Sequence, residues 1–165
     1  MAIGVGRPEE LAIAGLFHDI GIAGFSTSPN PVNMAELSAE DRERYMSHPQ
    51  ASINMLKSKK FVLTPSVTEI IEKHHERVDG QGFPGKLPSH KIPMAAQLLA
   101  FSDWFEYLSR PVPGQAKLTP LQVLAEIQAS ARLSIELTFK IKNFFSSLEA
   151  REKPEETSTA TEAAS

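Results

Sequence analysis

Cysteine is absent from this chain of 165 residues. The absence excludes a disulfide framework and metal sites built on thiolates, and it favours a reducing, cytoplasmic location. The sequence also lacks an apolar run of the ~18 residues that a membrane-spanning helix requires. Residues 1–10 contain no apolar segment typical of a signal peptide. We therefore expect no interaction with a membrane.

Excess positive charge is lacking as well. Lys and Arg together number 17 against 20 Asp and Glu, and the formal net charge is −3. No global basic field favours polymeric nucleic acid, so an anionic ligand would need a local source of positive charge, and bound metal ions are the obvious one. Hydrophobic residues make up 41% of the chain, which is ordinary for one soluble domain with a sizeable core.

Alternating strand patterns are missing too, whereas helical spacing recurs along the chain. The apolar residues before His18 and before His74 follow i, i+3, i+4, i+7 spacing, which places each histidine on the core side of a helix. Helix starts are predicted at Pro8, Ser38, Thr64-Pro65, Ile92-Pro93 and Thr119-Pro120. Pro49 predicts a break and a new helical start, and residues 135–148 a last amphipathic helix. The fold class is all-α, with six or seven helices.

The end of the chain differs from the rest in composition. Residues 151–165 consist mainly of Glu, Ser, Thr and Ala and contain no large apolar side chain. Such a segment cannot bury enough apolar surface to offset the entropy lost on ordering. We therefore expect one helical domain over residues 1–150, followed by a disordered acidic, Ser/Thr-containing tail.

The most informative residues are histidines and aspartates in four short segments. Four of the five histidines lie there, and the segments are His18-Asp19, His48, His74-His75 and Asp103. Imidazole and carboxylate together suit Fe, Mn, Zn or similar divalent ions. A carboxylate has two oxygens and can bridge two ions, which makes Asp19 the natural bridge. Because two or three such ions cleave phosphodiesters, the six side chains predict a metal-dependent phosphohydrolase in which Asp19 is also catalytic.

The same segments resemble the HD-GYP family, a subgroup of the HD-domain phosphohydrolases. That family carries a His-Asp-Ile-Gly-Lys motif, a His-Pro motif, a His-His-Glu-Arg-x-Asp-Gly-x-Gly-Tyr-Pro motif and an aspartate near an Arg-Pro pair. The corresponding residues here are 18–22, His48-Pro49, 74–84, Asp103 and Arg110-Pro111, so the resemblance covers roughly residues 8–112.

The resemblance implies a fold, an activity and a cofactor. The fold is an HD-domain-like helical bundle over residues 1–150. The activity is hydrolysis of the bacterial second messenger cyclic di-GMP to pGpG or GMP by a metal-bound hydroxide. The cofactor is a cluster of two or three divalent ions, most often iron or manganese, with Zn, Ni or Mg as alternatives.

The sequence departs from the family pattern at several positions. Ile22 replaces a lysine that is expected to contact substrate phosphate, and Phe83 replaces a tyrosine, so its hydroxyl is missing. Val112 and Pro113 stand where the family tends to have a tyrosine and a basic residue. The family also has a metal-binding histidine on a preceding helix, and Met1 lies too close to His18 for this sequence to contain it. Either the natural chain is longer, or one metal position has fewer ligands.

The glycine-rich block after His74-His75 predicts a loop. The residues that form it include Asp79, Gly80, Gly82, Phe83 and Pro84. We expect Asp79 to hydrogen-bond its own backbone, and the loop to hold the two histidines in place and to present Phe83 to a ligand.

Three charged residues have two interpretations each. Glu76 and Arg77 form either a solvated pair or a support that orients the ligand histidines. Arg110 is either a surface residue or a phosphate contact, for which its planar guanidinium is suited. With Ile22 in place of lysine, Arg110 is the best remaining candidate for binding substrate.

Two functions stay open at this point. The first is a phosphodiesterase that acts on cyclic di-GMP. The second is a catalytically impaired regulatory or ligand-binding signalling module, similar to the related HDOD domains, because the lysine and the hydroxyl are lost. A protein signalling partner or a homodimer fits either function, and the helix that contains Phe144-Phe145 is either core or a dimer face.

Overall fold

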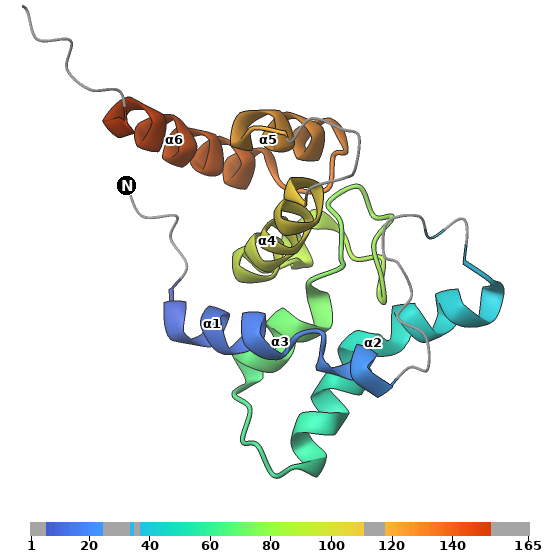
Figure 1. Cartoon of the computed structure of the whole chain (residues 1–165). Coiled ribbons are helices and arrows are strands. Elements are labelled where there is room, and N and C mark those ends of the chain that lie inside the picture. Colours follow the sequence, from blue (N-terminus) through green and yellow to red (C-terminus); the bar gives the residue numbers. More distant parts are fainter. Residues whose placement is uncertain (1–5, 25–33, 35–36, 111–117, 153–165) are drawn as a thin grey trace, which may run out of the picture.

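The computed structural model describes residues 6–24, 34, 37–110 and 118–152. These residues form six α-helices and two short 3-10 helices and contain no strand, which confirms the predicted all-α class (Figure 1). The elements are α1 (Pro8–Phe17), η1 (Ile20–Gly24), α2 (Ala39–Ser58), α3 (Pro65–Lys73), η2 (Ser89–Lys91), α4 (Met94–Ser109), α5 (Pro120–Ala129) and α6 (Ile135–Glu152). None of the helices described is both long and apolar enough to cross a membrane.

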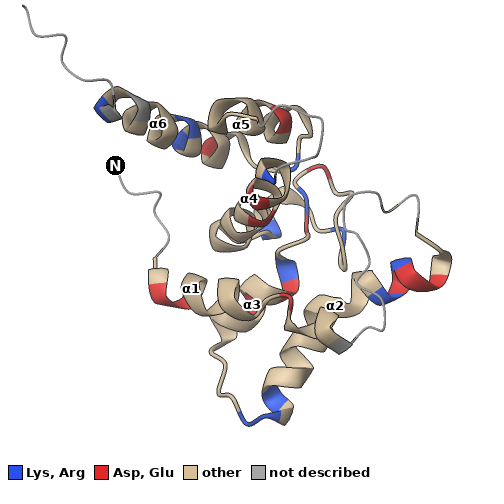
Figure 2. Ribbon diagram, viewed as in Figure 1, with Lys and Arg blue, Asp and Glu red and all other residues tan. Residues whose placement is uncertain are grey.

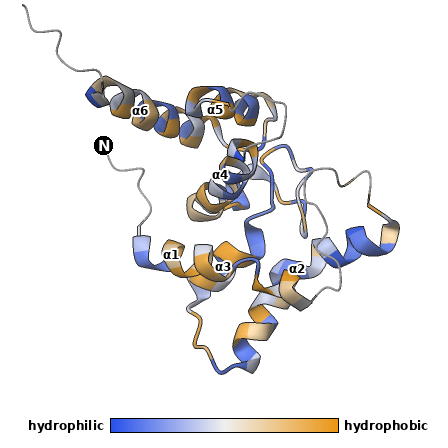
Figure 3. Ribbon diagram, viewed as in Figure 1, coloured by the Kyte–Doolittle hydropathy of each residue, from blue (hydrophilic) through white to orange (hydrophobic). Residues whose placement is uncertain are grey.

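Helix α4 lies between two groups of buried apolar side chains. The first core cluster is formed by α1, α2 and α3 with Leu99 of α4, and the second by α5 and α6 with Phe101 of α4. Figure 1 shows the corresponding arrangement, with α1, α2 and α3 on one side of α4 and α5 and α6 on the other. Figure 3 shows hydrophobic residues along α3 and along the parts of α1 and α2 next to it. Burial of these faces is the main favourable term for the fold.

Side-chain caps start three of the helices where the sequence predicts them. Ser38 Oγ accepts a hydrogen bond from the Asp41 backbone N–H at 3.0 Å, and Thr64 Oγ1 accepts one from Val67 at 3.2 Å. Thr119 and Gln122 form a reciprocal capping box at the start of α5. Each cap satisfies backbone donors that a helix leaves unpaired at its N-terminus.

The predicted break at Pro49 was wrong, because α2 continues through this residue from Ala39 to Ser58. A proline inside a helix has no N–H to donate to the carbonyl four residues earlier, here that of Tyr45. His48 Nδ1 donates to that carbonyl instead, at 2.6 Å. Figure 2 shows that the charged positions of α2 lie near its two ends, so the uncharged middle with His48 and Pro49 packs inside the protein.

Helix α6 is longer than the sequence indicates. It includes Arg151 and Glu152, which the composition assigns to the tail, and residues 153–165 of that tail lie outside the described residues. Leu137 and Ile141 are buried as predicted, whereas the Phe144 side chain is 44% exposed and does not belong to the core. Val112 and Pro113 also lie outside the described residues.

Gly21 in η1 lies directly against the backbone of α2. Its N–H donates to Ser52 Oγ at 2.9 Å, and the Ser52 hydroxyl donates to the His18 carbonyl at 2.5 Å. A Cβ atom on Gly21 would lie 2.6 Å from the His48 carbonyl oxygen and equally close to the Ser52 nitrogen. Only glycine permits this approach, which sets His18 and Asp19 beside α2.

Gly21→Ala should therefore lower the free energy of unfolding by about 1–3 kcal/mol, the usual cost of overpacking against a backbone that cannot move aside. Urea denaturation followed by circular dichroism measures the change. Gly15→Ala in α1 is the matched control, because the nearest atom to its added Cβ lies 3.8 Å away. This control should be neutral or stabilising by up to about 1 kcal/mol. Equal stability changes in the two variants would contradict the close-approach assignment.

Candidate metal centre

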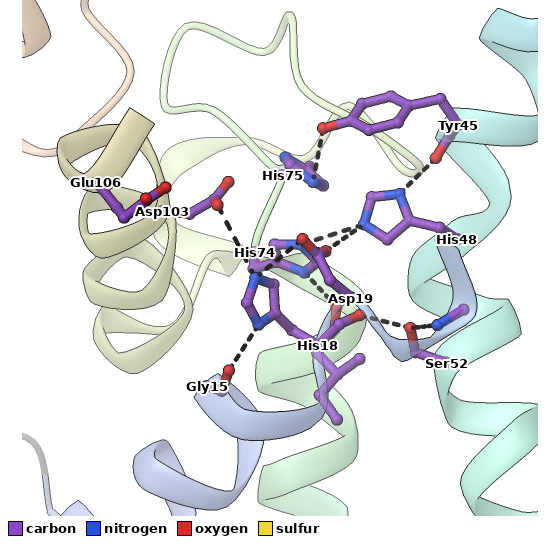
Figure 4. A network of polar contacts seen from close by, with 12 residues as sticks. Gly15, His18, Asp19, Tyr45, His48, Ser52, His74, His75, Asp103 and Glu106 are labelled. Atoms are coloured by element: carbon purple, nitrogen blue, oxygen red, sulfur yellow. Dashed lines mark hydrogen bonds and ion pairs between the residues drawn. The ribbon is translucent and has the colours of Figure 1, made fainter. Parts of the chain in front are cut away.

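The six predicted metal ligands converge from four parts of the chain. His18 and Asp19 lie between α1 and η1, His48 in the middle of α2, and Asp103 in α4. His74 and His75 follow the last residue of α3. Figure 4 shows these side chains pointing toward one another from their separate elements. The predicted convergence is therefore present in the structure.

The six side chains form two overlapping groups. We call Asp19, His48, His74 and His75 the His48 group, and His18, Asp19 and Asp103 the Asp103 group. Within each group, one candidate ligand atom per residue lies within 4.8 Å of all the others. Asp19 is the one residue that belongs to both.

Asp19 presents its two oxygens to different histidines. Oδ1 lies 3.2 Å from His48 Nε2 and 3.8 Å from His74 Nε2. Oδ2 lies 3.4 Å from His18 Nε2, and the Asp103 carboxylate lies 4.0 Å from that same nitrogen. This is the orientation that a carboxylate needs to bridge two cation positions.

Three of the histidines are held by the same backbone contact. His18 Nδ1 lies 2.8 Å from the Gly15 carbonyl, His48 Nδ1 2.6 Å from that of Tyr45, and His74 Nδ1 2.7 Å from that of Ile71. Because a carbonyl oxygen only accepts, Nδ1 must carry the proton in each ring. In the neutral form of such a ring Nε2 carries a lone pair, and here Nε2 of each ring faces Asp19.

Within the described part of the chain, no donor satisfies these lone pairs. His48 Nε2 and His74 Nε2 lie 3.4 Å apart, and each presents a lone pair to the other. His18 Nε2 and Asp19 Oδ1 are buried without a hydrogen-bond partner among the described residues. Unpaired buried acceptors are costly, and a cation placed among them would satisfy all of them. The donor set of imidazole nitrogen and carboxylate oxygen therefore fits a divalent transition metal such as Fe, Mn or Zn.

Burial keeps two of the ligand histidines neutral. Desolvation, with the neighbouring His18 and His48, lowers the pKa of His74 to about 3. Desolvation and the adjacent His74 likewise lower the pKa of His75 well below its ordinary value. Both rings are thus in the form that binds metal at neutral pH.

The two carboxyl groups of the centre shift in opposite directions. Burial acts to raise the pKa of Asp19, but its contacts with His48, His18 and His74 outweigh burial, so the pKa falls below its ordinary value. Burial and the negative charge of Asp19 raise the pKa of Asp103. Two carboxylates and no cation in one small volume would repel each other, which again favours a bound ion.

The loop after α3 packs around His75 as predicted. The Phe83 ring stacks on the His75 ring with centroids 4.5 Å apart, and the Phe83 N–H donates to the His75 carbonyl at 3.1 Å. A Cβ on Gly82 would overlap the backbone of residues 75–77. Phe83 is only 9% exposed, so it supports the histidine in addition to lining the cleft described below.

The rest of the loop is held by its own polar groups. Asp79 accepts a hydrogen bond from the Gln81 N–H at 3.0 Å, as predicted, and Gly80 has a positive φ of 72° that favours glycine. Arg77 pairs with Asp79 at 2.5 Å. Glu76 is buried, and its carboxylate accepts from the backbone N–H groups of Gly85 at 2.5 Å and Leu87 at 2.9 Å, just after Pro84. Of the two interpretations of Glu76 and Arg77, the mutual solvated pair is not formed, because each residue has another partner.

A cleft of about 520 Å³ opens beside the metal ligands. Asp19, His74, His75 and Asp103 line one part of it, and Trp104, Tyr107, Arg110 and Arg132 line another. Ile22 also contributes to the wall. Arg110 is mostly exposed, and its guanidinium pairs with the Glu106 carboxylate at 2.7 Å. Its predicted role in substrate binding stays a prediction.

Sequence reasoning missed Arg132 and Tyr45. The Tyr45 hydroxyl lies 3.4 Å from His75 Nε2, and the Arg132 guanidinium lies over the Trp104 ring, 3.8 Å from its centroid. Neither residue belongs to a motif, and both reach the site only through packing between distant elements. The single tryptophan of the chain was the one available signal, because an isolated Trp in a cleft often marks a binding surface.

Comparisons with known proteins place this geometry in a family. A family model described as "HD domain" matches residues 7–136. The chain is 26% identical over 157 residues to a cyclic di-GMP phosphodiesterase of Thermotoga maritima. The aligned residues cover 90% of the chain and 42% of that protein. It is 30% identical over 107 residues to a cyclic di-GMP phosphodiesterase of Pseudomonas aeruginosa, which covers 64% of the chain and 25% of that protein.

Two further comparisons extend this result. The chain is 26% identical over 114 residues to a 3′3′-cGAMP-specific phosphodiesterase of Vibrio cholerae, which covers 68% of the chain and 21% of that protein. The solved structure of Bd1817, an HDG"Y"P protein from Bdellovibrio bacteriovorus, shares the fold with a TM-score of 0.59 at 19% identity, over 84% of this chain and 44% of that one. The chain spans less than half the length of each of these relatives. It belongs to the HD domain family, and within that family its motifs resemble those of the HD-GYP group, as the sequence predicts.

Proposed function

We propose that this chain is a metal-dependent phosphodiesterase domain that hydrolyses cyclic di-GMP to pGpG or GMP. The observation that carries the proposal is the position of Asp19, whose two oxygens face two separate groups of ligands beside a cleft. The names of the relatives as phosphodiesterases support the reaction class. One relative is named as specific for 3′3′-cGAMP, so a second cyclic dinucleotide belongs in the test.

The ligand groups suggest how the centre is assembled. The His48 group would hold one ion and the Asp103 group a second, with Asp19 shared between them. When bound, two such ions supply an activated water at neutral pH and neutralise charge on the phosphate. We propose iron or manganese, since nitrogen and carboxylate donors suit both.

The protein's own residues orient the histidine rings of this site. The three backbone carbonyls keep Nδ1 of His18, His48 and His74 protonated, so that Nε2 is free in each ring. Phe83 and the loop behind it keep His75 in place. No side chain needs to serve as a general base for the attacking water when the metals lower the water's pKa.

A second function is favoured by one feature of the cleft. Ile22 lines the wall, and Phe83 contributes no hydroxyl there, so both positions lack polar groups for holding a phosphodiester. A regulatory or ligand-binding module that retains metal and binds a cyclic dinucleotide without cleaving it would have this combination. Turnover separates the two functions.

The purified chain loaded with Mn²⁺ or Fe²⁺ should convert cyclic di-GMP to pGpG or GMP, because all six ligands converge in the structure. Chromatography of the products measures the reaction, with 3′3′-cGAMP as a parallel substrate and metal-free protein as the control. Saturable binding of cyclic di-GMP with no product would reject the phosphodiesterase in favour of the binding module. The absence of both would reject cyclic di-GMP as the ligand.

Asp19→Ala should reduce the bound metal from about two ions per chain to one or none, because it removes the shared ligand. Elemental analysis after dialysis measures the stoichiometry. Glu43→Ala is the matched control, since Glu43 is an exposed carboxylate in α2. Unchanged metal content in Asp19→Ala would refute the bridging assignment.

Pro49→Ala tests how His48 is held. The new N–H at position 49 can donate to the Tyr45 carbonyl and so compete with His48 Nδ1 for that acceptor. Metal affinity should fall about tenfold, in the range found when a partner of a metal-binding histidine is removed, while stability is kept or increased. Metal titration and thermal unfolding measure the two effects. Unchanged affinity would show that the Tyr45 carbonyl does not orient His48.

A further inference from the structure

Arg132 lies on the short connection between α5 and α6 and contributes to the wall of the cleft. Two hydrogen bonds, one from a backbone N–H and one from a side chain, fix this connection to the loop that follows His75. The Val78 N–H donates to the Arg132 carbonyl at 3.2 Å, and the Arg77 guanidinium donates to the Ser130 carbonyl at 3.2 Å. These bonds therefore hold Arg132 close to the segment that contains His74 and His75.

The Arg132 guanidinium lies over an aromatic ring. Its central carbon lies 3.8 Å from the centroid of the Trp104 ring, which places the cation over the aromatic face. Trp104 follows the metal-ligand candidate Asp103 directly in α4. The guanidinium is a planar fork of N–H donors, which suits it for binding an anion beside the ring.

The charge on Arg132 has no close partner within the described part of the chain, although Asp79 lies near enough to favour it. No carboxylate there forms an ion pair with it, and its Nε is buried without a hydrogen-bond partner. Burial and the neighbouring Arg77 lower the pKa of Arg132, which means that the surroundings disfavour its charged form. An unpaired, half-buried cation of this kind is costly until an anion binds.

The other two arginines in the wall of the cleft have carboxylate partners. Arg77 pairs with Asp79 at 2.5 Å, and Arg110 pairs with Glu106 at 2.7 Å. Ile22 brings no charge. Among the cations described in this wall, Arg132 is thus the one that can bind an anion without first breaking an ion pair with a carboxylate.

We propose that Arg132, stacked on Trp104, binds a phosphate group of the nucleotide ligand in the cleft beside the metal centre. This subsite rests on the proposed function for the identity of the ligand as a cyclic dinucleotide, whereas binding of a phosphate by Arg132 does not require turnover. The guanidinium donates two hydrogen bonds to phosphate oxygens in the fork geometry that arginine favours. It thereby supplies the positive charge that Ile22 does not.

The test uses the full chain loaded with Mn²⁺ and titrated with pGpG, a linear dinucleotide that carries phosphates. Trp104 is the only tryptophan, so its fluorescence reports binding beside Arg132. Arg132→Met should weaken binding roughly ten- to a hundredfold, the effect of losing a charge-assisted hydrogen bond, while leaving metal content unchanged. Arg132→Lys should lose less, because it keeps the charge but not the planar fork. Arg151→Met, at the exposed end of α6, is the matched control and should bind like the wild type.

Kinetics on cyclic di-GMP complete the test. Arg132→Met should raise KM more than it lowers kcat. Equal affinity of Arg132→Met and wild type for pGpG, or no saturable change in Trp104 fluorescence, would overturn the subsite even if the wild type hydrolyses cyclic di-GMP. Arginine-dependent binding of pGpG by a chain with no turnover would support the subsite and reject the phosphodiesterase. If Arg132→Met does not fold, the affinity of Arg132→Lys decides: weaker binding supports the subsite, and unchanged binding overturns it.

Discussion

The centre depends on one repeated contact, in which a histidine Nδ1–H donates to the backbone carbonyl three residues earlier. His18, His48 and His74 all make it, at 2.6–2.8 Å. The contact fixes both the tautomer and the direction of each ring, so that three Nε2 lone pairs point into one small volume. Without it, the rings could rotate and pair with one another or with Asp19, and the unpaired acceptors that make the site fit a cation would vanish.

A regular helix offers no free carbonyl for such a contact, so the three histidines lie where regularity ends. His18 and His74 are the C-caps of α1 and α3, where the last carbonyls of a helix have no helical donor. His48 lies inside α2, but Pro49 deprives the Tyr45 carbonyl of its usual partner and creates an equivalent position. The His-Pro pair is thus a way to place a helix-end contact in the middle of a buried helix. Adjacent ligands at the ends of helices also explain how His18 and Asp19, or His74 and His75, reach the same centre.

The sequence predicted what depends on local pattern and residue chemistry. It predicted the helix starts at Ser38, Thr64 and Thr119 and the convergence of the six candidate ligand side chains around Asp19, because spacing and donor type suffice for these. It failed at Pro49, because the His48 side chain donates to the Tyr45 carbonyl in place of the missing backbone N–H, and α2 continues. It left two interpretations open for Glu76, because the partners of Glu76 lie beyond the glycine-rich loop and depend on how that loop folds back. Arg132 could not be predicted, since stacking on Trp104 is a product of tertiary packing between α4 and the α5–α6 connection.

Because α4 lies between the two core clusters, the two ligand groups depend on different parts of the fold. Every residue of the His48 group belongs to, or directly follows, an element of the first core cluster. The Asp103 group reaches across to α4, whose Phe101 is packed among the apolar side chains of α5 and α6. Asp103 therefore lies on the one helix that contributes to both core clusters, and the geometry of its group depends on the packing of both.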